Sequence, residues 1–250
     1  MNTPLIIAHR GNSSSAPENT LEAIREAIAI GSDCVEVDVR CTKDSIPVLM
    51  HDPGLGRVTG DRGNVASLTL EQVRELEVNS EQGRERIPTL EEAILEVRDR
   101  ARLVAEVKVD CCDQIAELVN RLKVTEGIYF SAFRLDLIQK LYRSMPNFDV
   151  VWVLDTFGWV GRKSAAAIET ASESEVTIVA PTLAALSESS ICCAHEVGLH
   201  VWTWGCENDE QFRKALGMGV DGIITGNPQE LMDLLGSAGH PASLAPVTMG

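Results

Sequence analysis

The chain has 250 residues, 44% of them hydrophobic, and its 22 Lys and Arg against 37 Asp and Glu give a net charge of -15 at pH 7. This length and hydrophobic content suffice for one sizeable core. The negative charge disfavours binding to nucleic acids or to anionic membranes, so a phosphate ligand would need a local cation or a metal.

Seven cysteines are present, and Cys111-Cys112 and Cys192-Cys193 are adjacent pairs that do not readily bridge within themselves. No cysteine or histidine spacing typical of zinc sites occurs. The first eight residues lack the features of a signal peptide, and no stretch approaches eighteen apolar residues. These features predict a reduced, cytoplasmic protein without stable membrane association, and they leave the oligomeric state open.

Short apolar runs rich in Val and Ile alternate with segments of helical period, as in parallel strands joined by crossover helices. The predicted strands are Leu5–Ala8, Cys34–Val39, Leu103–Val107, Ile128–Phe130, Val150–Leu154, Thr177–Val179, Leu199–Thr203 and Gly222–Thr225. The predicted helices are Thr20–Ile30, Leu90–Asp99, Gln114–Val124, Leu135–Met145, Ser164–Ala171, Ser187–Glu196, Asp209–Leu216 and Pro228–Leu235. Eight strands with eight helices predict the α/β class and a (β/α)8 barrel, also called a TIM barrel.

Two segments depart from this alternation. Ile46–Met50 indicates an extra strand after the second one, and residues 52–88 form a Gly- and Glu-rich excursion that we interpret as an insertion over the barrel mouth. Residues 237–250 are rich in Ala, Ser, Pro and Gly, which predicts a loosely ordered tail. We therefore expect a single barrel domain over residues 1–236.

Carboxylates collect at the strand ends, where a barrel of this kind has its active site. Glu36 and Asp38 lie two residues apart on the second strand, as do Glu106 and Lys108 at the third, so each pair projects to one side. Three converging carboxylates repel each other unless a cation lies among them, and oxygen ligands suit Mg²⁺ or Ca²⁺. Alternatively, these acids form a structural network with basic neighbours such as Lys108 and Arg10.

Two histidines follow predicted strands near these acids. His9 comes after the first strand and His51 after the extra strand, so the two imidazoles can serve as general base and general acid. Metal ligation or a place in the core are the alternatives. His195 lies in a predicted helix and His200 near the start of a strand, which favours structural roles for both.

Trp202 and Trp204 flank Thr203 and therefore share one side of the seventh strand. An indole on that side can form the wall of a ligand pocket, which makes Trp202 a candidate substrate contact. The alternative is ordinary packing inside the barrel.

Several of these segments form an ordered series along nearly the whole chain. They are His9-Arg10-Gly11, Ala16–Thr20, Glu36-Val37-Asp38, His51-Asp52 with Leu55 and Arg57, Ile87–Ala93, Glu106-Val107-Lys108, Val201–Thr203 and Gly219–Thr225. This series resembles the glycerophosphodiester phosphodiesterase family, and the ordered set is highly specific.

The resemblance implies a (β/α)8 barrel with a small insertion after the second strand, and hydrolysis of a glycerophosphodiester substrate to glycerol 3-phosphate and an alcohol. It also implies that His9 and His51 form an acid–base pair. Glu36, Asp38 and Glu106 would hold one divalent cation, and Arg10 and Lys108 would contact the phosphate. Glu18 and Asn19 would order the first loop.

Three positions depart from the family pattern. Ala132-Phe133 stands where Ser-Phe is frequent, Gly226 where Asp is usual, and Trp204 where a smaller residue is common. We expect these positions to face the barrel mouth, so they bear on the choice of head group.

Three other functions remain open. A related barrel phosphodiesterase acting on lysophospholipids or sugar phosphodiesters would use the same site. A metal-dependent lyase or aldolase would explain the carboxylates but leave the paired histidines and Arg10 without a role. A binding module without catalysis would be expected to lack one of the reactive groups, and all are present.

Overall fold

The computed structural model describes residues 3–79, 85–159 and 162–237, and within these residues eight parallel strands close into a barrel. The strands are β1 (Leu5–Ala8), β2 (Cys34–Cys41), β4 (Arg102–Val107), β5 (Ile128–Ala132), β6 (Val150–Leu154), β7 (Ile178–Pro181), β8 (His200–Trp204) and β9 (Gly222–Thr225). Neighbours pair in chain order, and β1 pairs with both β2 and β9, which closes the sheet. The predicted (β/α)8 barrel is confirmed.

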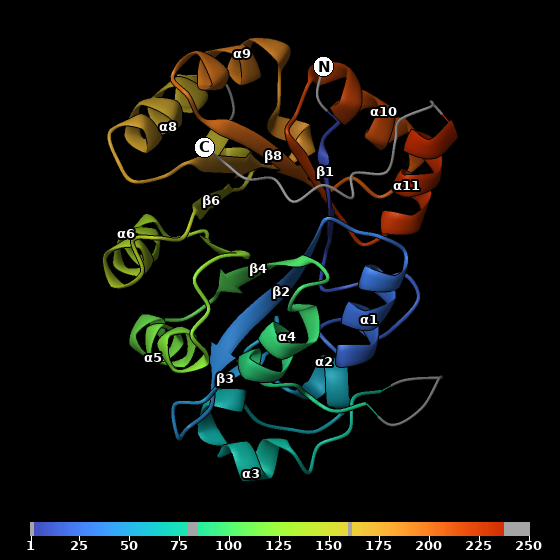
Figure 1. Ribbon diagram of the computed structural model, residues 1–250, viewed down its shortest axis with the longest axis vertical. Coiled ribbons are helices and arrows are strands. Elements are labelled where there is room, and N and C mark those ends of the chain that lie inside the picture. Colours follow the sequence, from blue (N-terminus) through green and yellow to red (C-terminus); the bar gives the residue numbers. More distant parts are fainter. Residues whose placement is uncertain (1–2, 80–84, 160–161, 238–250) are drawn as a thin grey trace.

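Helices form the outer layer around the sheet (Figure 1). They are α1 (Leu21–Ala29), α4 (Leu90–Val97), α5 (Cys112–Leu122), α6 (Leu135–Ser144), α8 (Arg162–Ser172), α9 (Glu188–Glu196), α10 (Asp209–Met218) and α11 (Pro228–Ser237). Their ends agree with the predictions to within about two residues, the usual uncertainty of helix ends. Polar caps explain several starts: Thr89, for example, forms a capping box with Glu92. The short α7 (Thr156–Trp159) and the 3-10 turn η2 (Leu183–Ala185) have no strong sequence signal and were not predicted.

Two layers of side chains fill the barrel and its surroundings. Outward-facing strand residues pack against the helices in the main hydrophobic cluster, whereas inward-facing residues form a second one. Inside the barrel, the rings of Tyr129 and Trp202 meet edge to face with centroids 5.1 Å apart. Because the interior is packed, the barrel is not a pore, and polar chemistry is confined to its mouth.

The predicted insertion after the second strand is present and carries a small core of its own. The strand β3 (Pro47–Leu49) runs antiparallel to β2, and α2 (Gly56–Thr59), the 3-10 turn η1 (Val65–Ser67) and α3 (Leu70–Val73) follow. Their shared hydrophobic cluster comprises Val48, Met50, Leu55, Val65, Val73, Val78 and Ile87. In Figure 1 this teal segment lies at the end of the molecule toward which β2 points.

The strand β3 matters for the site because it runs antiparallel to β2 and brings the chain back alongside Asp38. The Met50 N–H donates to the Asp38 carbonyl at 2.8 Å, so His51 lies level with the carboxylates of β2. Of the predicted loose tail, residues 238–250 lie outside the described residues. Among the helices that are described, none combines the length and apolar character needed to cross a membrane.

Candidate active site

The loop after β1 carries His9 and Arg10 and depends on an unusual backbone. Arg10 has a φ of 59° and Gly11 a φ of 82°, so two consecutive residues are left-handed. A β-carbon at Gly11 would lie 2.6 Å from the backbone carbon of Ala23 in α1. Glycine is therefore required there, and the strained Arg10 is the kind of residue that surrounding contacts hold in place at functional sites.

Gly11→Ala is expected to destabilise the fold by about 2–4 kcal/mol, because the left-handed backbone and the clash with α1 add together. Urea unfolding measures this change. Gly217→Ala is the matched control: a β-carbon at this position in α10 meets nothing within 4 Å, so a small gain of up to about 1 kcal/mol is expected. Equal stability of the two variants would contradict the close packing of the loop on α1.

Three buried carboxylates converge at the barrel mouth. Glu36 and Asp38 come from β2, and Glu106 on β4 is the register partner of Asp38. Each residue offers one oxygen to a group whose atoms all lie within 4.8 Å of one another. Burial and the neighbouring carboxylates raise the pKa of Glu36 well above its ordinary value, and burial also raises the pKa of Glu106. This cluster is therefore an unfavourable place for negative charge without a cation.

Lys108 and Arg10 form ion pairs with Asp38, one of the three carboxylates of the cluster. The Lys108 ammonium lies 2.9 Å from Asp38 Oδ1, and Arg10 Nε lies 3.1 Å from Asp38 Oδ2. Burial opposes ionisation of Asp38, but these two positive charges outweigh it and hold its pKa below the ordinary value. Lys108 also contacts Glu106. The positively charged side chains of Lys108 and Arg10 thus both lie at the carboxylate cluster, where they can contact a bound phosphate.

The residues present fit a divalent cation. Glu36 Oε2 accepts the Arg10 N–H at 2.9 Å, but Glu36 Oε1 is buried and has no hydrogen-bond partner among the described residues. The ion pairs with Lys108 and Arg10 offset the charge of Asp38 but leave Glu36 Oε1 without a hydrogen-bond partner. An unsatisfied buried carboxylate oxygen beside two further carboxylates suits a hard, oxygen-binding ion.

His9 lies at the edge of this cluster, with its Nε2 4.0 Å from Glu36 Oε2. Partial burial of the imidazole, together with the positive charge of Arg10, lowers the pKa of His9 from 6.5 to about 4. The imidazole is therefore neutral at pH 7 and able to accept a proton.

His51 is oriented by its neighbour in the sequence. Asp52 accepts a hydrogen bond at 2.7 Å from His51 Nδ1 and another at 2.6 Å from Arg57 Nε in α2. These hydrogen bonds, from Arg57 first and His51 second, lower the pKa of Asp52 to about 2. Because the carboxylate can only accept, Nδ1 carries the proton and Nε2 remains free for a substrate.

Arg57 connects the insertion to the loop after β1. Its guanidinium donates two hydrogen bonds of 2.8 Å to the Glu18 carboxylate, which also accepts from Arg10 at 3.1 Å. Asn19 in the same loop binds the Asp38 side chain and backbone at 2.8 and 2.9 Å. The proposed catalytic loops are thus held by one polar network. Asp52 and Arg57 belong to a motif of the sequence, but the motif alone does not predict these contacts.

The sequence and the fold match one family of known proteins. The model of the glycerophosphoryl diester phosphodiesterase family matches residues 9–230. The chain belongs to this family. This family member is 32% identical over 235 residues to a putative glycerophosphodiester phosphodiesterase of Bacillus subtilis, and the matched region covers 89% of this chain and 94% of the relative. It is also 28% identical over 246 residues to a glycerophosphodiester phosphodiesterase of Caldanaerobacter subterraneus, spanning 94% and 99% of the two chains.

A solved structure supports the same assignment. The phosphodiesterase of Oleispira antarctica in complex with the product sn-glycerol-3-phosphate superposes with a TM-score of 0.82 at 26% identity, covering 93% of this chain and 97% of that one. The family predicted from the motifs is therefore confirmed.

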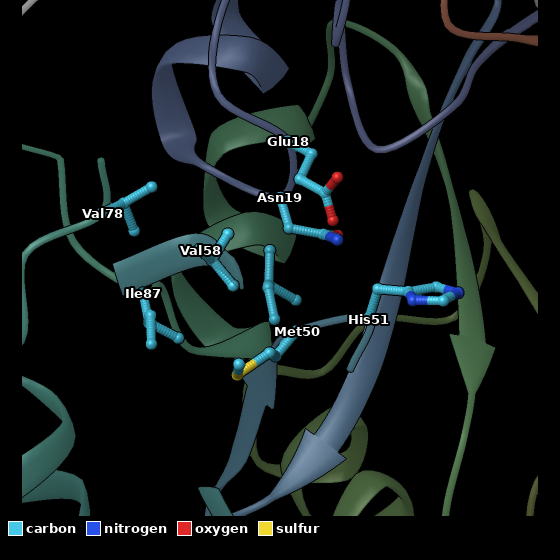
Figure 2. A pocket seen from close by; sticks show the side chains of 8 residues that line it. Glu18, Asn19, Met50, His51, Val58, Val78 and Ile87 are labelled. Atoms are coloured by element: carbon cyan, nitrogen blue, oxygen red, sulfur yellow. The ribbon is translucent and has the colours of Figure 1, made fainter. Parts of the chain in front are cut away.

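In this phosphodiesterase family member, a small cavity lies between the end of β3, the rest of the insertion and the loop after β1. Figure 2 shows the apolar side chains of Met50, Val58, Val78 and Ile87 on one side, with the His51 imidazole pointing away from them. The cavity measures about 10 Å³, room for about one water molecule. It is too small for an acyl chain.

The two tryptophans of β8 lie at different depths. Trp202 is 2% exposed and packs with the inward-facing cluster, which favours the alternative of ordinary barrel packing over substrate contact. Trp204 lies two residues nearer the mouth and donates from Nε1 to the carbonyls of Leu154 and Ala180 at 3.2 and 3.1 Å. Trp204 is therefore the tryptophan nearer the site.

Phe133 joins Trp204 at the mouth. Their rings are edge to face at 6.0 Å, and Lys108 Nζ lies 5.6 Å from the Phe133 centroid. Phe133 is 43% exposed although it is large and apolar. This aromatic pair borders the lysine side of the carboxylate cluster. His195 and His200 instead contact Asp221 just before β9, at the opposite end of the barrel.

Proposed function

We propose that this protein hydrolyses glycerophosphodiesters to glycerol 3-phosphate and an alcohol by general acid–base catalysis of His9 and His51, with one divalent cation at Glu36, Asp38 and Glu106. The observation that carries this proposal is a buried cluster of three carboxylates flanked by a neutral histidine and by a histidine with a fixed tautomer. The family membership and the product bound to the Oleispira relative support the choice of substrate.

The chain supplies a partner for each part of the reaction. A cation held by the three carboxylates, Mg²⁺ or Ca²⁺, would offset the negative charge that develops on the phosphoryl oxygens. Lys108 and Arg10 donate charge-assisted hydrogen bonds to the same oxygens.

Proton transfer is divided between the two histidines. His9 accepts a proton from the nucleophile, which is water or a hydroxyl of the glycerol moiety, because it is neutral at pH 7. His51 Nε2 donates a proton to the departing alkoxide, and the Asp52 carboxylate stabilises the charged imidazolium that serves as the donor. A glycerol hydroxyl as nucleophile would give a transient cyclic phosphate, which ³¹P NMR detects.

Release of glycerol 3-phosphate from glycerophosphocholine and glycerophosphoethanolamine tests the proposal. We expect release with Mg²⁺ or Ca²⁺ and loss of at least about 10²-fold in rate with excess chelator, restored by the added cation. Circular dichroism under each condition controls for folding. A folded protein that releases no product with either cation would contradict the proposed function, and chelator-resistant release would contradict the cation site alone.

The structure gives less support to lysophospholipids as substrates. The exposed large hydrophobic residues among the described residues are Leu95 on α4, Phe133 just after β5 and Val197 just after α9. An acyl chain would need a continuous apolar surface or a tunnel. The proposed substrates are therefore water-soluble diesters.

A further inference from the structure

We propose that Glu207 is a positioning residue for this reaction: its carboxylate holds the end of β9, and through β9 it sets the place of the loop that carries His9 and Arg10. This inference rests on the proposed function. Neither the family motifs nor the carboxylate cluster includes Glu207.

The Glu207 side chain makes two contacts with the end of β9. It lies in the segment between β8 and α10, and its Oε2 accepts from the Gly226 N–H at 3.1 Å and from the Thr225 hydroxyl at 3.4 Å. Its own backbone is fixed as well, because its N–H donates to the Gln211 side chain at 2.7 Å. Glu207 is exposed, but these hydrogen bonds fix the position of its Oε2.

The two residues that Glu207 contacts hold the catalytic loop at both ends. The Thr225 carbonyl accepts from the His9 N–H at 2.8 Å, and the Gly226 carbonyl accepts from the Ser14 N–H at 3.0 Å. Between these two hydrogen bonds lie Arg10 and Gly11 with their left-handed backbone. A displacement of the Thr225–Gly226 peptide would therefore move the imidazole and the guanidinium together.

Gly226 leaves space that the Glu207 carboxylate occupies. A β-carbon at Gly226 would lie 3.2 Å from Glu207 Oε2 and 2.9 Å from the Ser13 hydroxyl oxygen. Gly226 is not among the residues with a positive φ, so its backbone accepts other side chains. An aspartate at position 226 would thus compete with Glu207, but it could supply a carboxylate when Glu207 is shortened and the Ser13 hydroxyl rotates away.

Four variants test this arrangement: Glu207→Ala, Glu207→Gln, Gly226→Asp and the double variant Glu207→Ala/Gly226→Asp. For glycerophosphocholine hydrolysis with saturating cation, we expect Glu207→Ala to lower kcat about tenfold with a smaller change in KM, since misplaced catalytic groups lose rate before affinity. Glu207→Gln keeps most of kcat because its amide oxygen still accepts the Gly226 N–H. Gly226→Asp alone lowers kcat, and the double variant recovers most of the loss seen in Glu207→Ala.

Amide hydrogen exchange of His9 and Ser14 supplies a readout independent of activity. We expect faster exchange of both amides in Glu207→Ala and protection close to wild type in Glu207→Gln and in the double variant. Glu210→Ala, in the exposed first turn of α10, is the matched control and should change neither kcat nor exchange.

Two results would overturn the inference: wild-type kcat and exchange in Glu207→Ala, or a double variant no better than Glu207→Ala. If the wild-type protein released no glycerol 3-phosphate, the proposed function would fail, while the exchange rates would still show whether Glu207 holds the loop.

Discussion

Replacement of His9 or His51 by Ala is expected to lower kcat about 10²–10⁴-fold, the range for loss of a general acid or base. Neither histidine belongs to the hydrophobic clusters, and their side chains are 32% and 35% exposed, so the fold should persist. Steady-state kinetics and circular dichroism measure the two effects. His200→Ala, at the opposite end of the barrel, is the control and should retain wild-type kcat.

The two histidines should respond differently to the leaving group. A p-nitrophenyl ester of glycerol phosphate needs no proton on its departing oxygen, so the defect of His51→Ala should shrink with this substrate while that of His9→Ala persists. Rescue of His9→Ala instead would reverse the proposed roles. Full turnover of either alanine variant on an unactivated diester would remove that histidine from the mechanism.

Glu36→Gln is expected to have opposite effects on stability with and without a cation. In the cation-free protein, burial and the neighbouring carboxylates raise the pKa of Glu36, so its ionised form opposes folding at pH 7 and a neutral amide should raise Tm. In the wild type, a cation at 100 times its Kd should stabilise the fold by about 2.7 kcal/mol, and the variant should lose this gain because one ligand is gone. We also expect its activity to fall about 10²–10³-fold, equivalent to several kcal/mol.

Thermal unfolding with and without Mg²⁺ or Ca²⁺ measures this difference. Glu91→Gln is a suitable control, because Glu91 lies on α4 and pairs with Arg121 away from the mouth. A Glu36→Gln protein with the same cation-induced shift in Tm as the wild type would exclude Glu36 as a ligand.

The strand pattern predicted most of the barrel and the convergence of the carboxylates. Residues two apart on a strand share a face, and parallel strands end at one side of a barrel, so Glu36, Asp38 and Glu106 were expected together. The direct pairing of Asp38 with Glu106, 68 positions later in the chain, depends on the register between β2 and β4. Local periodicity does not encode that register.

Depth along a strand was not predictable in the same way. The alternation that puts Trp202 and Trp204 on one side of β8 is correct, but it does not say which indole lies in the packed interior and which lies at the mouth. The contacts of Arg57 were also hidden, because α2 is only four residues long and the partner Glu18 is 39 positions away. The contacts of Glu207 were not predictable either, because its partners, the Thr225 hydroxyl and the Gly226 N–H, are 18 and 19 positions away.

The proposed chemistry is unevenly distributed around the ring of strands. His9, Glu36, His51 and Lys108 with their neighbours precede β5, whereas the aromatic pair at the mouth comes from Phe133 and Trp204, beyond it. The residues that we propose to transfer protons are thus separate in sequence from the aromatic side chains at the mouth. We therefore expect substitutions at positions 133 and 204 to change the preference for the alcohol while the proposed proton transfer is retained, which a two-site library at these positions would test.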